Sequence, residues 1–136
     1  MGIFEASIPC NKGSKPFPGI PTDAKCEFIK CVLTLYLLPG TQSPDKYILQ
    51  YSYGMSEPNT TGLKGGGITA ELQGNWKIAA GRVSDKKAVI YQLFSDKSDM
   101  PVSFVKLNDQ LLHLLDSDNR LMIGSAAWSF TFNRTK

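Results

Sequence analysis

The sequence is poor in the residues that most often build catalytic and metal sites. It contains one histidine, His113, and three cysteines among 136 residues. Histidine is the commonest general acid or base, and a metal site needs several ligating side chains close together. His113 stands in the apolar stretch 111–115, where a structural role is the expected one. We therefore predict no catalytic site, no bound metal and no cofactor.

Long apolar runs and one-sided charge are also missing. The longest apolar run covers residues 31–38, well short of the roughly 20 residues of a membrane-spanning helix. The formal net charge is +3, and acidic residues are interspersed among the basic ones, so no cationic stripe is available for a phosphate backbone. We expect a soluble domain that does not bind nucleic acid.

Sequence motifs of known enzyme classes are absent as well. The Gly-x-Ser-x-Gly turn of many hydrolases does not occur. The glycine run 65–67 lacks the lysine and hydroxyl residue that complete a phosphate-binding loop, and we interpret it as a flexible turn. We expect the protein not to be an enzyme.

Length and composition are those of one globular domain. Hydrophobic residues make up 42% of the chain and charged residues 20%, and both shares are ordinary for folded proteins. No repeat or linker divides the sequence. We therefore expect residues 1–136 to form a single domain around one core.

Apolar residues recur at every second position, which is the period of β-strands with one buried face. No segment shows the period of an amphipathic helix. This pattern predicts an all-β protein with at least five alternating strands. The positions that share a face are Ile29, Cys31, Leu33, Leu35 and Leu37; Tyr47, Leu49, Tyr51 and Tyr53; Trp76, Ile78 and Ala80; Val89, Tyr91 and Leu93; and Trp128, Phe130 and Phe132.

Turn signals separate these strands at short intervals, as in antiparallel sandwiches and barrels, and we favour an antiparallel barrel. Residues 11–25 hold three prolines and two glycines, which predict a long loop near the first strand. We expect Trp76 to be buried at the barrel base, beneath a turn at Gly74, with its indole N–H hydrogen-bonded.

The three cysteines, Cys10, Cys26 and Cys31, are candidates for one disulfide. In one extended strand Cys26 and Cys31 would lie roughly 16 Å apart, too far to be joined. Cys10, at the end of the first strand, is the natural partner for one of them. Cys26 is favoured because Cys31 shares the core face of Leu33 and Leu35, although three buried thiols remain an alternative.

Three short motifs near the start occur in a familiar order. They are Ile8-Pro9-Cys10, Pro18-Gly19-Ile20 and Leu33-Thr34-Leu35. The set resembles the Leu-Pro-Cys, Pro-Gly-Ile and Leu-Thr-Leu signature of the NlpE N-terminal domain family. Residues 72–76, 90–93 and 114–116 resemble that family's Gly-x-Trp strand, its Tyr-x-Leu strand and its closing Leu-x-Leu-Asp hairpin. The resemblance covers nearly the whole chain.

The resemblance implies a lipocalin-like β-barrel or half-barrel of about eight strands. It also implies a bacterial envelope lipoprotein, anchored in the outer membrane and linked to copper resistance or surface-stress sensing. The family's second cysteine, three residues after the first, is replaced here by Gly13, which speaks against copper binding. Residues 1–5 do not resemble a signal peptide, and we expect a leader and lipid anchor that this sequence lacks.

Two functions therefore remain open. The first is an envelope sensor that acts through contacts with a protein partner. The second is a carrier that holds a small apolar ligand inside the barrel. Large residues predicted to face inward would fill the barrel or line such a pocket: Trp76, Tyr91, Phe104, Trp128 and Phe130.

Overall fold

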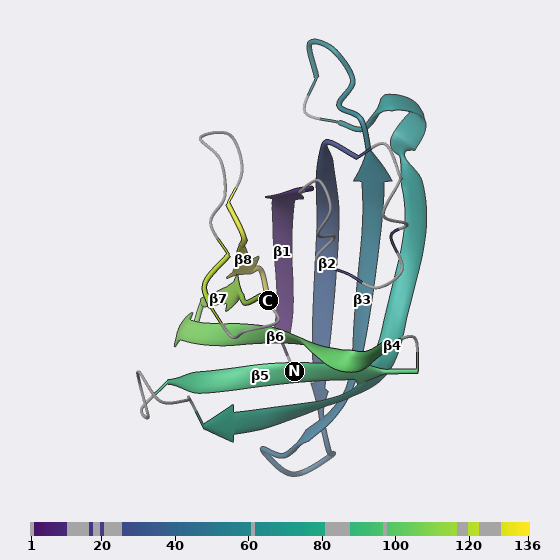
Figure 1. Ribbon diagram of the computed structural model, residues 1–136. Helices are drawn as coiled ribbons and strands as arrows, with labels where there is room; N and C mark the ends of the chain where they lie inside the picture. The colour runs from purple at the N-terminus through teal and green to yellow at the C-terminus, as the bar shows by residue number, and fades with distance from the viewer. Residues whose placement is uncertain are drawn as a thin grey trace.

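The chain forms a closed antiparallel barrel in which eight strands follow one another in sequence order (Figure 1). This computed structural model describes residues 2–10, 17, 20, 26–60, 62–80, 88–96, 98–116, 120–122 and 129–136. Within them the only helical element is the short 3-10 turn η1, Lys64–Gly66. The strands are β1 (Gly2–Pro9), β2 (Phe28–Leu37), β3 (Pro44–Gly54), β4 (Ile68–Ala80), β5 (Val89–Ser95), β6 (Ser98–Asn108), β7 (Leu111–Leu114) and β8 (Thr131–Arg134).

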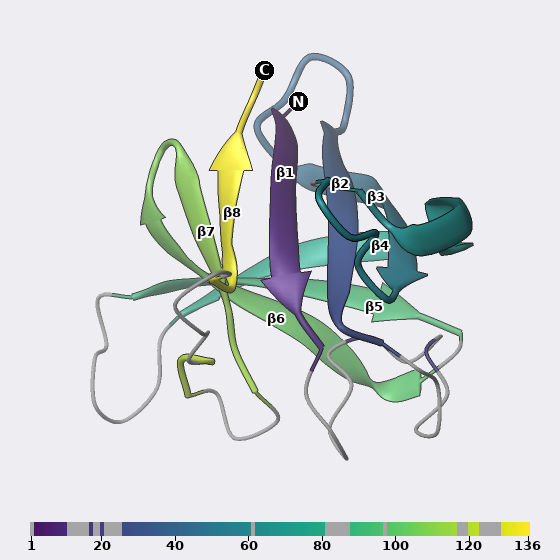
Figure 2. The same ribbon diagram turned by 90° about the horizontal axis from the view of Figure 1, so that it is seen from above.

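The all-β prediction is confirmed, and the barrel is closed instead of being a half-barrel. Closure occurs where β8 pairs with β1, Phe4 lying opposite Arg134 and Glu5 opposite Asn133. The amide of Thr135 also donates to the carbonyl of Ile3 at 2.7 Å. The first and last strands therefore lie side by side, as the view from above shows (Figure 2).

The barrel has two layers whose strands run in different directions. In Figure 1, β1, β2, β3 and the first part of β4 stand upright with alternating directions, while the end of β4, β5 and β6 cross in front of their lower part. Strand β4 belongs to both layers, because residues 68–75 pair with β3 and residues 76–80 pair with β5. Gly74 lies at this corner. A Cβ atom there would stand 1.9 Å from the carbonyl oxygen of Phe94, so only glycine permits the approach.

Alternate residues of each strand face the core, as the period of two predicts. Trp76 is buried as expected, but Gly74 lies within β4 and forms no turn. Ile78 and Val89 are 50% and 36% exposed, although the alternation placed them on the core face. Both lie in the paired segments at the end of β4 and the start of β5, where Ile78 is opposite Tyr91 and Val89 is opposite Ala80.

Two residues of the predicted loop 11–25 belong to the core. The structure describes only Phe17 and Ile20 within it, and their exposed fractions are 1% and 4%. The ring of Phe17 packs against Tyr51, with centroids 5.1 Å apart. Both side chains belong to the same core cluster as the inward-facing residues of β1 to β4.

Candidate functional site

A disulfide joins Cys10, just after β1, to Cys26, just before β2. The two Cα atoms are 5.7 Å apart and the cysteines are 16 positions apart in sequence. The amide of Cys10 also donates to the carbonyl of Glu27 at 3.3 Å. The bond therefore closes the segment that contains the core residues Phe17 and Ile20. The favoured pairing of Cys10 with Cys26 is confirmed.

Cys31 is the free cysteine, and it is buried among the inward residues of β2. Burial raises the pKa of its thiol, because the low-polarity core disfavours the thiolate. The thiolate is the reactive and metal-binding form. Cys31 is therefore an inert packing residue, as its place on the core face predicts.

His113 is held by its neighbours through both ring nitrogens. Nε2 lies 2.7 Å from the carbonyl oxygen of Met122, which can only accept a hydrogen bond. Nε2 must therefore carry the proton, and Nδ1 accepts from the hydroxyl of Thr131 at 2.9 Å. The ring links β7 to β8 and to residue 122. This arrangement is the structural role expected for the single histidine.

A cavity of about 290 Å³ opens at the end of the barrel where β1 begins and β2 and β8 end, and we call it the mouth cavity. Trp76 and Tyr91 line it, and their ring centroids are 4.9 Å apart. The indole N–H of Trp76 donates to the carbonyl of Tyr36 at 2.8 Å, which fixes the ring. The lining residues are Gly2, Phe4, Leu35, Leu37, Gln42, Trp76, Ile78, Tyr91 and Arg134.

Phe104 and Phe130, two of the other predicted interior residues, do not line this cavity. Phe104 and Phe130 are fully buried, and Phe104 packs edge-on against Phe132 with centroids 4.9 Å apart. They fill the barrel. Trp128 lies outside the described residues. The five predicted residues therefore divide into two that line the mouth, two that pack the core and one that is not described.

Sequence reasoning missed Phe4, Gln42 and Arg134. The alternation of Phe130 and Phe132 extends to residue 134, so it could have placed Arg134 inward. The Arg134 guanidinium lies over the ring of Phe4, 5.9 Å from its centroid. Its Nε donates to the carbonyl of Lys136 at 2.9 Å, and an NH group donates to the carbonyl of Asp109 at 3.5 Å.

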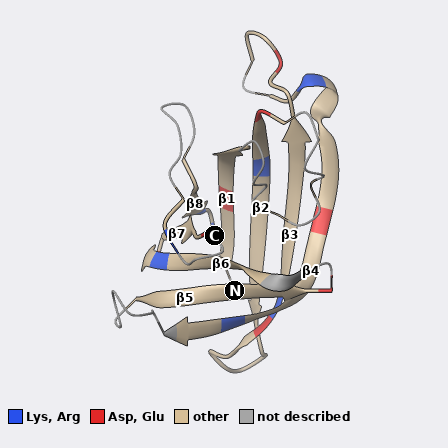
Figure 3. Ribbon diagram, in the orientation of Figure 1, with Lys and Arg blue, Asp and Glu red and all other residues tan. Residues whose placement is uncertain are grey.

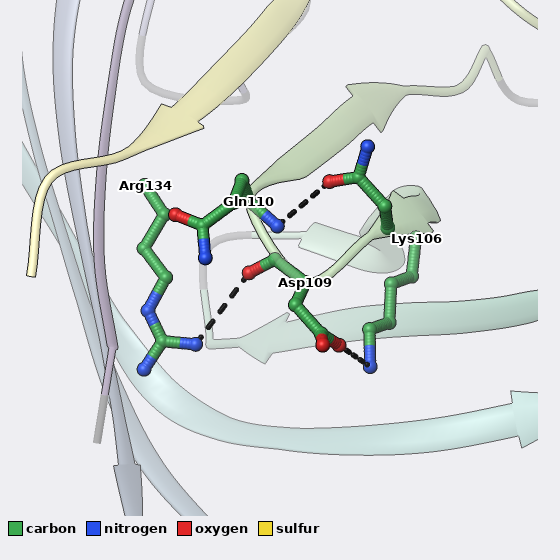
Figure 4. Close-up of polar contacts among 5 residues, drawn as sticks. Lys106, Asp109, Gln110 and Arg134 are labelled. Atoms are coloured by element: carbon green, nitrogen blue, oxygen red, sulfur yellow. Dashed lines mark hydrogen bonds and ion pairs between the residues drawn. The ribbon is translucent and has the colours of Figure 1, made fainter.

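A second cation, Lys106 near the end of β6, contacts the same turn between β6 and β7 as Arg134 (Figure 4). Lys106 Nζ is 3.1 Å from the carboxylate of Asp109, and this hydrogen bond, together with nearby Tyr91, raises the pKa of Lys106. The turn itself is fixed by the amide of Gln110, which donates to Asn108 Oδ1 at 2.7 Å. One turn therefore holds both Lys106 and Arg134 next to Tyr91.

The outer face of β1 to β4 carries a broader depression of about 1150 Å³, which we call the outer hollow. Basic and acidic residues are dispersed along the described strands, here as in the rest of the barrel (Figure 3). The outward-facing residues of the outer hollow are polar or charged in all but one case: Glu5, Ser7, Lys30, Val32, Gln50, Ser52, Thr69, Glu71 and Asn133.

Comparisons with known proteins add no relative. No family model, curated protein or solved structure matches this chain. In the described part of the chain, no three His, Cys, Asp or Glu side chains are grouped to hold a metal ion. Nor do the described residues include a helix long and apolar enough to cross a membrane.

Proposed function

We propose that this barrel is a non-enzymatic domain of an oxidising bacterial envelope that senses envelope stress through protein contacts, as its resemblance to the NlpE N-terminal domain implies. The observation that supports the location is the disulfide between Cys10 and Cys26. Disulfides persist in oxidising compartments and are rare in the cytosol. This bond also closes the segment that carries the core residues Phe17 and Ile20, so oxidation stabilises the fold.

The outer hollow is the surface on which we place the protein contacts. Glu5, Lys30 and Glu71 bring charges of both signs to a wide concave face of one rigid sheet. Mixed charges on such a face select a partner by complementary charge more than by apolar burial. The partner we propose is an envelope protein with a polar surface. Copper has weaker support, because the two paired cysteines offer no thiolate and Cys31 is buried.

The test is to export the chain, with a lipoprotein leader, into the envelope of a bacterial host that carries an envelope-stress reporter. We expect a higher signal than from an unrelated exported barrel of similar size and level. Lys30→Glu, within the outer hollow, should lower the signal. Lys64→Glu, on the exposed turn η1, is the matched control and should leave it unchanged. Equal signals from all four proteins would reject sensing through this face.

Free-thiol counting tests the location separately. Protein recovered from the envelope and denatured without reductant should show about one thiol per chain, since only Cys31 remains free. A count near three would remove the support that the disulfide gives to an envelope location.

The carrier function is a second candidate, and the mouth cavity favours it. Its volume of about 290 Å³ is at the lower end of small-molecule pockets. Aromatic walls from Trp76 and Tyr91 suit a small apolar body. The packed rings of Phe104 and Phe130 occupy the space below, so the ligand would sit at the mouth and not along the barrel axis.

A further inference from the structure

We propose that the mouth cavity selects small aromatic carboxylates. This proposal rests on the carrier candidate and names the class of ligand that such a carrier would hold. The juxtaposition that carries the inference is a guanidinium and two aromatic walls around one cavity. Arg134, Trp76 and Tyr91 come from β8, β4 and β5, and all three line it.

The aromatic side of the cavity is preformed. Trp76 is held by its hydrogen bond to Tyr36, and its ring is tilted by 54° against that of Tyr91. Aromatic rings contact a flat aromatic guest favourably in stacked or edge-on geometry. Leu35 and Leu37 complete the apolar lining. A planar apolar body therefore fits better than a hydrated polar one.

The charged side is positioned by the β6–β7 turn. The carbonyl of Asp109 accepts from Arg134, and the carboxylate of the same residue holds Lys106 (Figure 4). Asp109 therefore contacts both cations, the guanidinium through its carbonyl and the ammonium through its carboxylate. A guanidinium forms directional hydrogen bonds with a carboxylate, often two in parallel. The ligand's anionic group would therefore lie at Arg134.

The size of the cavity limits the ligand. At roughly 30 Å³ for each non-hydrogen atom, the share of a water molecule in the liquid, a cavity of about 290 Å³ holds about ten such atoms. A benzene ring with one carboxylate fits this volume. The Gln42 side chain, on the loop after β2, adds a neutral polar group to the lining.

The experiment compares benzoate with benzamide, which have the same ring and the same number of non-hydrogen atoms but differ in charge. Dissociation constants are measured at neutral pH by NMR titration, with the indole N–H signal of Trp76 as the reporter of the mouth. We expect benzoate to bind about tenfold more tightly or better, the scale of a charge-assisted hydrogen bond. Rising ionic strength should weaken benzoate binding and leave benzamide binding unchanged.

Variants assign the selectivity to Arg134. Arg134→Gln should bring benzoate down to the affinity of benzamide, and Arg134→Lys should keep part of the preference because the charge remains. Lys64→Gln, on the exposed turn η1 and outside the lining of the mouth cavity, is the matched control and should change neither constant. If Arg134→Gln does not fold, as judged by its thermal transition, Arg134→Lys and the salt dependence of the unmodified protein decide.

The outcomes separate the two proposals. Equal binding of benzoate and benzamide at the mouth would leave the carrier candidate standing and overturn the selection of carboxylates. A preference for benzoate that survives Arg134→Gln, or that shifts signals away from Trp76, would also overturn it. No binding of either probe would reject the carrier candidate together with this inference.

Discussion

The indole N–H of Trp76 donates to the main-chain carbonyl of Tyr36, 2.8 Å away, and so joins β4 to β2 past the end of β3. The contact depends on an irregularity, because the register between β2 and β3 shifts between Leu35 and Leu37. Tyr36 lies at this shift, where its carbonyl reaches Trp76. One side chain thus fixes the mouth of the barrel and the corner of the sheet.

Replacing Trp76 by alanine should lower the free energy of unfolding by about 3–5 kcal/mol, because a buried aromatic ring and its packing are lost. Trp76→Phe keeps most of the apolar surface but leaves the Tyr36 carbonyl without its indole donor, and should cost about 1–3 kcal/mol. Denaturant unfolding measures both. Gln73→Ala, at an exposed position of the same strand, should change stability by less than about 0.5 kcal/mol. An unchanged midpoint for Trp76→Ala would show that the residue is not part of the core.

The disulfide should contribute about 3 kcal/mol, the loop-entropy value for a separation of 16 residues. Reductant should therefore lower the melting temperature of the oxidised protein by about 10 °C. The double variant Cys10→Ser with Cys26→Ser should already melt at the lower temperature and should not respond to reductant. Differential scanning calorimetry with and without reductant provides the comparison. An equal response of both proteins would mean that reductant acts elsewhere than on this bond.

Local regularities explain what the sequence could predict. Inward positions such as Leu33, Leu49 and Leu93 follow from alternation, which depends only on neighbours in one strand. The choice of Cys26 over Cys31 followed from the same rule, since Cys31 lies in phase with Leu33. These inferences needed no knowledge of how the strands meet.

Features set by contacts between distant strands were not predictable. Gly74 lies at a corner because the pairing partner of β4 changes there from β3 to β5. The sequence of residues 72–76 contains no signal that predicts this change of partner. Phe17 lies in the predicted loop 11–25, but its ring is buried in the core against Tyr51, a contact between distant parts of the chain. The mouth cavity needs β1, β2, β4, β5 and β8 together, so its lining could not be read from any one of them.

Gly74→Ala should be among the most damaging single methyl additions in this chain. The new Cβ would stand 1.9 Å from the Phe94 carbonyl oxygen, a main-chain atom that cannot move without separating β4 from β5. We expect a loss of about 3 kcal/mol or more, at the upper end of overpacking effects. Gly62→Ala is the control, because its Cβ would meet only Thr60 Oγ1, at 3.7 Å. Similar unfolding midpoints for the two variants would contradict the close approach at Gly74.

Alkaline pH should destabilise the protein through Cys31. Burial raises the pKa of its thiol in the folded state, while in the unfolded chain the thiol ionises near its ordinary value of about 8.5. The unfolded state therefore loses a proton that the folded state keeps, and stability that is fully present below about pH 8.5 falls as pH rises above it.

The slope contributed by this group approaches about 1.4 kcal/mol for each pH unit. Unfolding free energies measured between about pH 8.5 and pH 9.5 should show this decline, below the ordinary tyrosine pKa of about 10. Cys31→Ala loses some packing at every pH, so the two proteins are compared by the slope of the unfolding free energy against pH. This slope should be shallower in the variant by the contribution of one thiol. Parallel pH profiles for the two proteins would show that Cys31 ionises as readily in the fold as in the unfolded chain.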